Sequence, residues 1–78
     1  MPRFLFHLYN DEITRDEEGQ DFPDFESAQR AAFEAARAMI GEEARLGKVN
    51  LSHRIEVEDE IGLPCFTVRF RDAIQVED

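Results

Sequence analysis

The sequence predicts one α+β domain in which a single long helix packs on one face of a mostly antiparallel four-stranded sheet, in the chain order ββαββ. Alternating apolar and polar residues near both ends of the chain indicate strands. Apolar residues spaced by three and four through the middle indicate an amphipathic helix. A chain of 78 residues supports only one core, so residues 1–78 form a single domain.

The first strand is predicted over residues 3 to 9, RFLFHLY, where large apolar residues alternate. The Asn-Asp pair after it favours a tight turn into a short second strand, EITR, with Ile13 on the same face as Leu8. One face of the first strand carries Phe4, Phe6 and Leu8, and the other carries Leu5, His7 and Tyr9.

One amphipathic helix is predicted from Asp24 to near Leu46. Asp24 is suited to cap the first backbone amides, and Gly47 is suited to end the helix in the left-handed conformation. The small alanine side chains allow the helix to lie close to a sheet. The apolar stripe consists of Phe25, Ala28, Ala32, Phe33, Ala36, Met39 and Ile40.

The second hairpin is predicted from HRIEVEDE and PCFTVRF, which flank a turn at residues 61 and 62. With this turn, Val57 faces Phe66 and Ile55 faces Val68 on the inner face. On the outer face, Glu56 lies diagonal to Arg69. The alternation in the tail, DAIQVED, is too short to decide between an extension of the last strand and a segment that folds back.

The acidic stretch RDEEGQDFPDFESA suggests a calcium loop at first sight, because hard cations prefer clustered carboxylates. Its spacing does not fit, since aligning Gly19 with the glycine of an EF-hand places Phe25 where the bidentate glutamate belongs. The same residue types suit the start of a helix: Gly19 permits a bend, Pro23 favours an extended chain, and Asp24 caps. The sequence therefore predicts no metal site and no cofactor.

The charge balance limits the classes of partner. Eighteen acidic residues against nine basic ones give a net charge of −9, which opposes binding to nucleic acid or to an anionic membrane surface. A single cysteine, Cys65, excludes an intrachain disulfide, and the N-terminus lacks the features of a signal peptide. We therefore expect a cytoplasmic protein that binds neither nucleic acid nor membrane.

A candidate interaction face follows from the predicted sheet. One helix can shield only one sheet face, so the apolar residues on the other face favour a homodimer or a protein partner. Self-association is expected either by covering this face or by pairing edge strands. The sequence contains no catalytic constellation, which favours a non-catalytic interaction or regulatory module. One alternative is a small enzyme or ligand-binding protein that uses His7, Glu56 and Arg69, and another is an acidic decoy or antitoxin-like protein that binds a basic protein. The candidate face comprises Leu5, His7, Tyr9, Glu56, Thr67 and Arg69.

Three segments, MPRFLFHLYNDE, RDEEGQDFPDFESAQRAAFEAAR and IEVEDEIGLPCFTVRFRDAIQVE, carry a family resemblance. In order, and over almost the whole chain, they resemble a group of small bacterial proteins, frequent in rhizobia and their relatives, catalogued as a domain of unknown function. The recurring pieces are the Phe-His strand, the run from Asp16 to Asp24 and the closing Phe-Arg-Asp-Ala. Relatives usually have an Asp-Gly turn, whereas Ile61 precedes Gly62 here. The resemblance implies a bacterial cytoplasmic protein and supplies no activity, cofactor or catalytic residue.

Overall fold

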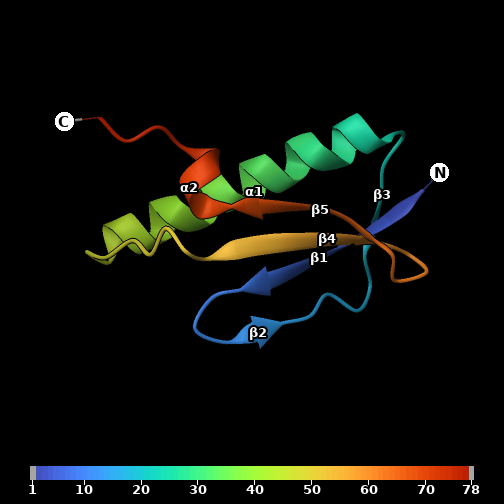
Figure 1. Ribbon diagram of the computed structural model, residues 1–78, viewed down its shortest axis with the longest axis horizontal. Coiled ribbons are helices and arrows are strands. Elements are labelled where there is room, and N and C mark those ends of the chain that lie inside the picture. The colour runs from blue at the N-terminus through green and yellow to red at the C-terminus, as the bar shows by residue number, and fades with distance from the viewer. Residues whose placement is uncertain (1, 78) are drawn as a thin grey trace.

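The computed structural model describes residues 2–77 and confirms the α+β fold (Figure 1). The strands pair in the order β2-β1-β4-β5, and every pair is antiparallel. Figure 1 shows α1 along one side of this sheet, near β5 and far from β2. The elements are β1 (Arg3–Tyr9), β2 (Ile13–Thr14), β3 (Gln20–Asp21), α1 (Phe25–Arg45), β4 (Arg54–Asp59), β5 (Pro64–Arg69) and α2 (Phe70–Ala73).

The sheet has five strands instead of the expected four, because β3 also pairs with β1. Both β2 and β3 are short and lie along the same edge of β1, where Leu8 is opposite Thr14 and Phe4 is opposite Gln20. The extra strand comes from the acidic stretch, which was expected to serve only as the start of the helix. This stretch is therefore part of the sheet.

The first hairpin differs from the prediction by one residue. Its loop consists of Asn10, Asp11 and Glu12, so that Tyr9 pairs with Ile13. The loop is closed by the Asn10 side chain, which accepts a hydrogen bond from the Glu12 amide at 3.0 Å. Because side chains alternate between faces, this one-residue shift moves Ile13 to the face of Tyr9, where it is 63% exposed. The expectation that Ile13 continues the face of Leu8 was wrong.

The second hairpin has the expected inner-face register, with Val57 opposite Phe66 and Ile55 opposite Val68. Its turn is longer than expected, and the pairing shifts by one residue after Val57. Gly62 adopts a φ of 89°, and the Asp59 side chain accepts hydrogen bonds from the amides of residues 61 and 63. The turn is therefore built by Asp59 and Gly62 together, without an Asp-Gly pair.

The core lies between α1 and the inner sheet face. Alanines on the buried side of α1 bring the helix close to β4 and β5, as expected. Phe70 is fully buried, but it lies in α2 and not in a strand, because β5 ends at Arg69. Arg37 of α1 fixes α2 by donating a hydrogen bond to the carbonyl of Ala73 at 2.7 Å. The buried apolar residues are Phe4, Phe22, Ala28, Ala32, Ala36, Ile40, Ile55, Val57, Val68, Phe70 and Ala73.

The predicted helix ends are confirmed. The Asp24 carboxylate accepts a hydrogen bond from the Ser27 amide at 2.8 Å, which caps the N-terminus of α1. At the C-terminus, the amide of Gly47 bonds to the carbonyl of Ala44, and the amide of Lys48 bonds to the carbonyl of Glu43. With Gly47 at a φ of 96°, these two bonds form a Schellman motif.

The glycine inside α1 gives a first testable expectation. Gly41 is exposed, and a Cβ atom added there would meet no atom within 4 Å. We expect Gly41→Ala to raise the free energy of unfolding by about 1 kcal/mol, because alanine loses less backbone entropy than glycine on entering a helix. Urea unfolding of both proteins measures this difference. A loss of stability would mean that residue 41 is not in a regular, open helix.

Candidate functional site

The acidic stretch closes the outer edge of β1. The Asp16 carboxylate accepts a hydrogen bond from the Phe6 amide at 3.1 Å, between the sites where β2 and β3 pair with the strand. The same carboxylate accepts bonds from the amides of Glu18 at 3.2 Å and Gly19 at 3.0 Å. On this edge of β1, the Phe6 amide lies between the residues that pair with β2 and those that pair with β3. Asp16 supplies the hydrogen-bond acceptor for this amide.

The protonation of Asp16 is coupled to this arrangement. Burial raises the pKa of the Asp16 carboxyl. The hydrogen bonds from the amides of Gly19, Phe6 and Glu18 together lower this pKa by more than burial raises it, so the pKa of Asp16 lies below its usual range. A carboxylate that accepts several backbone amides is stabilised in its charged form. The loop is therefore held by an ionised Asp16.

His7 lies beneath the same loop, and its side chain is only 1% exposed. Its Nδ1 accepts a hydrogen bond from the Asp16 amide at 3.0 Å, so we assign the proton to Nε2. Nε2 lies 3.0 Å from the Glu58 carboxylate, to which it donates. Arg15 approaches the same carboxylate at 3.5 Å. Both ring nitrogens of His7 are thus bonded within the chain, and the ring has no access to a substrate.

The predicted trio of His7, Glu56 and Arg69 shares the outer face but does not form one site. The Glu56 carboxylate accepts a hydrogen bond from Arg54 at 2.6 Å, although the register places Glu56 opposite His7. Arg69 bonds to Asp72 at 2.9 Å. Each of the three side chains has a different charged partner, which weakens the enzyme interpretation.

The outer face is largely covered by the chain itself. The Arg54 guanidinium lies 4.3 Å from the centre of the Tyr9 ring, a cation–π contact. A Cβ atom on Gly19 would lie 2.8 Å from the Leu5 side chain, so the backbone of the acidic stretch packs against Leu5. Thr67 is exposed. Leu5 and Tyr9 are half-buried, so this face lacks the bare apolar patch on which the expectation of a face-to-face dimer depended.

The opposite edge of the sheet, along β5, is open. The Phe70 amide donates a hydrogen bond to the carbonyl of His53 at 2.9 Å, just before β4. This bond shows which residues of β5 direct their backbone groups toward β4. Hydrogen-bonding direction alternates along an antiparallel strand, so the amide and carbonyl groups of Thr67 and Arg69 point away from β4. Within residues 2–77, β4 is the only strand that pairs with β5.

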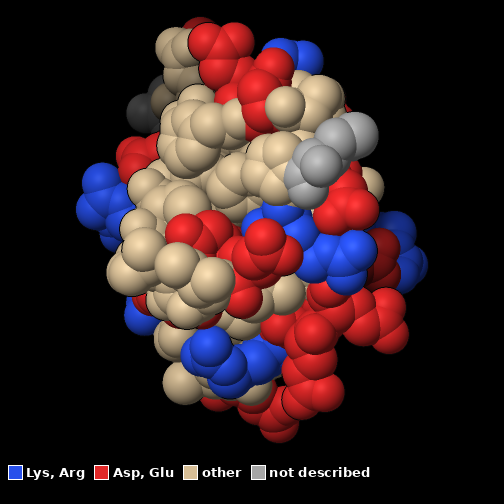
Figure 2. Space-filling model, turned by 90° about the vertical axis from the view of Figure 1, so that its right-hand side faces the viewer, with Lys and Arg blue, Asp and Glu red and all other residues tan. Residues whose placement is uncertain are grey.

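The strand at this edge carries no acidic side chain of its own, although Arg69 is paired with Asp72. No acidic residue occurs between Ile61 and Arg71. Phe25, which is 46% exposed, packs edge to face against Phe66 with ring centres 5.1 Å apart. Figure 2 faces the end of the molecule where α1 begins and the turn between β4 and β5 lies. It shows uncharged side chains over much of the left side, with some acidic side chains among them and a denser acidic group at the lower right.

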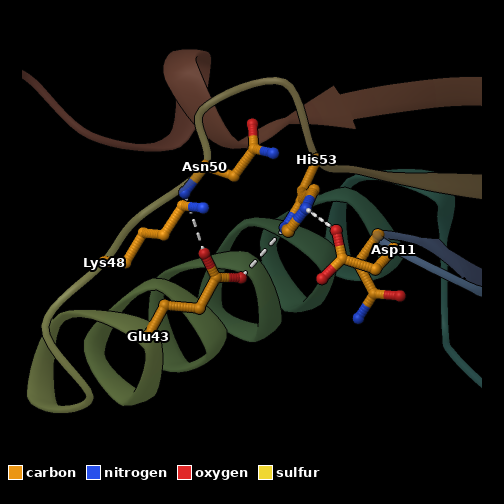
Figure 3. A pocket seen from close by; sticks show the side chains of 6 residues that line it. Asp11, Glu43, Lys48, Asn50 and His53 are labelled. Carbon is orange, nitrogen blue, oxygen red and sulfur yellow. Dashed lines mark hydrogen bonds and ion pairs between the residues drawn. The ribbon is translucent and has the colours of Figure 1, made fainter.

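A pocket of about 230 Å³ lies where the β1–β2 loop meets the segment between α1 and β4 (Figure 3). His53 Nδ1 lies 3.1 Å from the Glu43 carboxylate, and its Nε2 lies 3.6 Å from the Asp11 carboxylate. Nε2 is buried and has no hydrogen-bond partner. His53 was expected only as part of the HRIEVEDE strand, because Glu43 and Asp11 lie far from it along the chain. The pocket is lined by Asn10, Asp11, Glu43, Lys48, Asn50 and His53.

Other kinds of site find little support in the described part of the chain. Burial, together with the charges of Asp59 and Glu58, raises the pKa of the Cys65 thiol, which disfavours the reactive thiolate. Within residues 2–77, no group of three or more His, Cys, Asp or Glu side chains is arranged to hold a metal ion. In the same range, neither helix combines the length and the apolar character that crossing a membrane requires.

Comparison with known proteins identifies the family and nothing more specific. Neither the curated proteins nor the solved structures gave a significant match. The family described as "Domain of unknown function (DUF6894)" matches residues 3–71, which is most of the chain. The resemblance to a domain of unknown function is therefore confirmed over this range, which contains the Phe-His strand and the acidic stretch and ends at Arg71. The chain belongs to the DUF6894 family of domains of unknown function.

Proposed function

We propose that the protein is a non-catalytic interaction module of the bacterial cytoplasm that self-associates by pairing β5 with β5 of a second copy. The open edge of β5 is the observation that carries this proposal, because unpaired strand groups are a template for another strand. The free thiol of Cys65 suits a reducing compartment. The net charge of −9 favours a protein over nucleic acid as the partner.

Antiparallel pairing of two β5 strands around a two-fold axis at Thr67 fits the edge. Thr67 would lie opposite its own copy, and Cys65 would lie opposite Arg69. The interface is then the same patch on both copies, as in most homodimers. It also brings together segments without acidic residues, which reduces the repulsion between two chains of the same negative charge.

The competing interpretations have less support. An enzyme that uses His7 would need that ring to be accessible, and its side chain is only 1% exposed. An acidic decoy would use exposed carboxylates, and Asp16, Asp24 and Asp59 are not among them, because they accept hydrogen bonds from backbone amides of the chain. These carboxylates therefore have structural partners of their own.

Proline at position 67 tests the proposal. Thr67→Pro removes an amide that points away from β4, so the intrachain ladder keeps its bonds. A two-fold dimer loses this donor on both copies, and at about 0.5–1.5 kcal/mol per hydrogen bond we expect dimerisation to weaken roughly tenfold to a hundredfold. Sedimentation velocity over a range of protein concentrations measures the effect.

Thr67→Ala is the matched control, because alanine shortens the side chain and keeps the amide. We expect the wild type and Thr67→Ala to dimerise alike. A wild-type protein that remains monomeric at the highest soluble concentration would contradict self-association. A dimer that Thr67→Pro leaves unchanged would place the interface elsewhere.

A further inference from the structure

We propose that His53 and Asp11 form a binding site for a divalent transition-metal ion such as Zn²⁺, with Glu43 orienting the histidine. The site lies in the pocket of Figure 3 and does not depend on the pairing of β5. It joins three parts of the chain: the β1–β2 loop, the last turns of α1 and the segment before β4.

The orientation of His53 is fixed from several sides. Its ring packs edge to face on Phe70, with ring centres 5.6 Å apart. Its backbone accepts a hydrogen bond from the Phe70 amide and donates one to the Asn50 carbonyl. The side chain is 11% exposed, so the ring cannot turn freely. His53 therefore presents Nε2 in a fixed direction.

Glu43 determines which ring nitrogen carries the proton. One oxygen of its carboxylate accepts a hydrogen bond from the Asn50 amide at 3.0 Å, and the other lies 3.1 Å from His53 Nδ1. A carboxylate can only accept here, so Nδ1 donates, and in the neutral ring Nε2 carries a lone pair. A carboxylate bound to one ring nitrogen is the usual partner of a histidine whose other nitrogen binds a metal.

The lone pair of Nε2 faces a second acceptor. Asp11 Oδ1 lies 3.6 Å away, and Nε2 is buried with no hydrogen-bond partner. A neutral Nε2 and a carboxylate this close repel unless a cation lies between them, which is either a proton on Nε2, giving an ion pair, or a bound metal ion; the zinc titration below separates the two. The separation is near that of two ligands bound to one ion, because metal–nitrogen and metal–oxygen distances are each about 2 Å.

The donor atoms indicate the class of metal. Imidazole nitrogen suits zinc, nickel and copper, whereas calcium and magnesium prefer a shell made entirely of oxygen. Lys48, the cation that lines the pocket, extends toward Asn50 in Figure 3. Two protein ligands leave the remaining positions to water, so we expect an affinity weaker than that of a four-ligand structural site.

Calorimetric titration with Zn²⁺ at neutral pH, with Mg²⁺ as the comparison ion, tests the site. We expect one zinc equivalent per chain and no heat from magnesium. Asp11 is 94% exposed, so Asp11→Asn should not disturb the fold, and we expect it to weaken binding at least tenfold. Glu12→Gln removes one negative charge from the adjacent residue, as Asp11→Asn does at position 11, and should leave the affinity for zinc unchanged. Equal weakening by both variants would indicate a nonspecific charge effect and overturn the proposal.

Two further variants remove the ambiguity that a folding defect would cause. Asp11→His places a second imidazole in the exposed loop and should tighten zinc binding, an outcome that a merely destabilised chain cannot give. In Glu43→Gln, the side-chain amide can donate a hydrogen bond to Nδ1 of His53. The imidazole proton then lies on Nε2, which can no longer bind a metal ion, so we expect zinc binding to weaken about tenfold. In amide NMR spectra, Ni²⁺ should broaden residues 10–12 and 50–54 and spare the region of His7. No zinc heat, or broadening elsewhere, would overturn the proposal.

Discussion

Replacing Asp16 with alanine is expected to lower the free energy of unfolding by about 3 kcal/mol, a large effect for one partly exposed residue. The substitution removes the acceptor of three backbone amides, including the Phe6 amide at the edge of β1. Hydrogen bonds to a charged group contribute about 1.5–3 kcal/mol each, and partial exposure reduces that value here. Urea or thermal unfolding measures the loss.

Two matched variants separate the role of Asp16 from its charge. Glu17→Ala removes the neighbouring acid, which is exposed, and should change stability little. Asp16→Asn keeps one carbonyl oxygen but loses the charge, so we expect an intermediate loss. Because the folded pKa of Asp16 lies below its unfolded value, its contribution is present above about pH 4 and declines as the pH falls through the folded pKa. The stability gap between the wild type and Asp16→Asn should therefore narrow in acid. A stability difference that stays constant as the pH falls would contradict an ionised Asp16 carboxylate at the edge of β1.

The second large effect is expected at Gly19. Its φ of 74° disfavours any side chain, and a Cβ atom would lie 2.9 Å from the carbonyl oxygen of Phe4 and 2.8 Å from the Leu5 side chain. The conformational penalty alone is about 1–2 kcal/mol, and the clash with the backbone oxygen adds to it because that atom cannot move freely. We expect Gly19→Ala to cost about 3 kcal/mol in all.

Gly62 is the matched control for Gly19. It also has a positive φ, 89°, but a Cβ atom there would meet no atom within 4 Å. Gly62→Ala should therefore show only the conformational penalty, and the difference between the two alanine variants measures how closely the loop packs on β1. Equal losses at both positions would mean that the loop does not touch the strand as described.

Local patterns predicted most of the fold. The period of the apolar residues placed β1, α1, β4 and β5, and the capping residues Asp24 and Gly47 placed both ends of the helix. These features depend on residues close together in the chain. The predicted pairing of Val57 with Phe66 also held, although the turn between them was longer than expected.

The features that the sequence did not predict depend on longer-range contacts. Asp16 bonds to Phe6 across ten residues, and no local rule relates a carboxylate to the edge of a strand that precedes it. His53 meets Glu43 and Asp11 only after α1 folds back against the sheet. Phe70 fits the apolar pattern of β5, yet it lies in α2, where Arg37 donates a hydrogen bond to the carbonyl of Ala73. The spacing of Asp16 and Gly19 was visible in the sequence and was interpreted as part of the start of the helix.

The two edges of this sheet therefore differ in physical character. The edge of β1 is closed by β2, Asp16 and β3, whereas β5 pairs only with β4 within residues 2–77. Proteins commonly protect exposed edges with charge, proline or a covering segment, because open edges recruit other strands. Protection at one edge only leaves a single direction in which the sheet can grow, which favours a closed pair of chains over a fibre.

Hydrogen–deuterium exchange at single-residue resolution, recorded at low and high protein concentration, tests this difference directly. We expect the Phe6 amide to be protected at every concentration, because Asp16 of the same chain bonds to it. We expect the amides of Thr67 and Arg69 to exchange quickly when the protein is dilute and slowly when it is concentrated. Rapid exchange at Thr67 and Arg69 at all concentrations, or rapid exchange at Phe6, would contradict a closed edge at β1 and a self-pairing edge at β5.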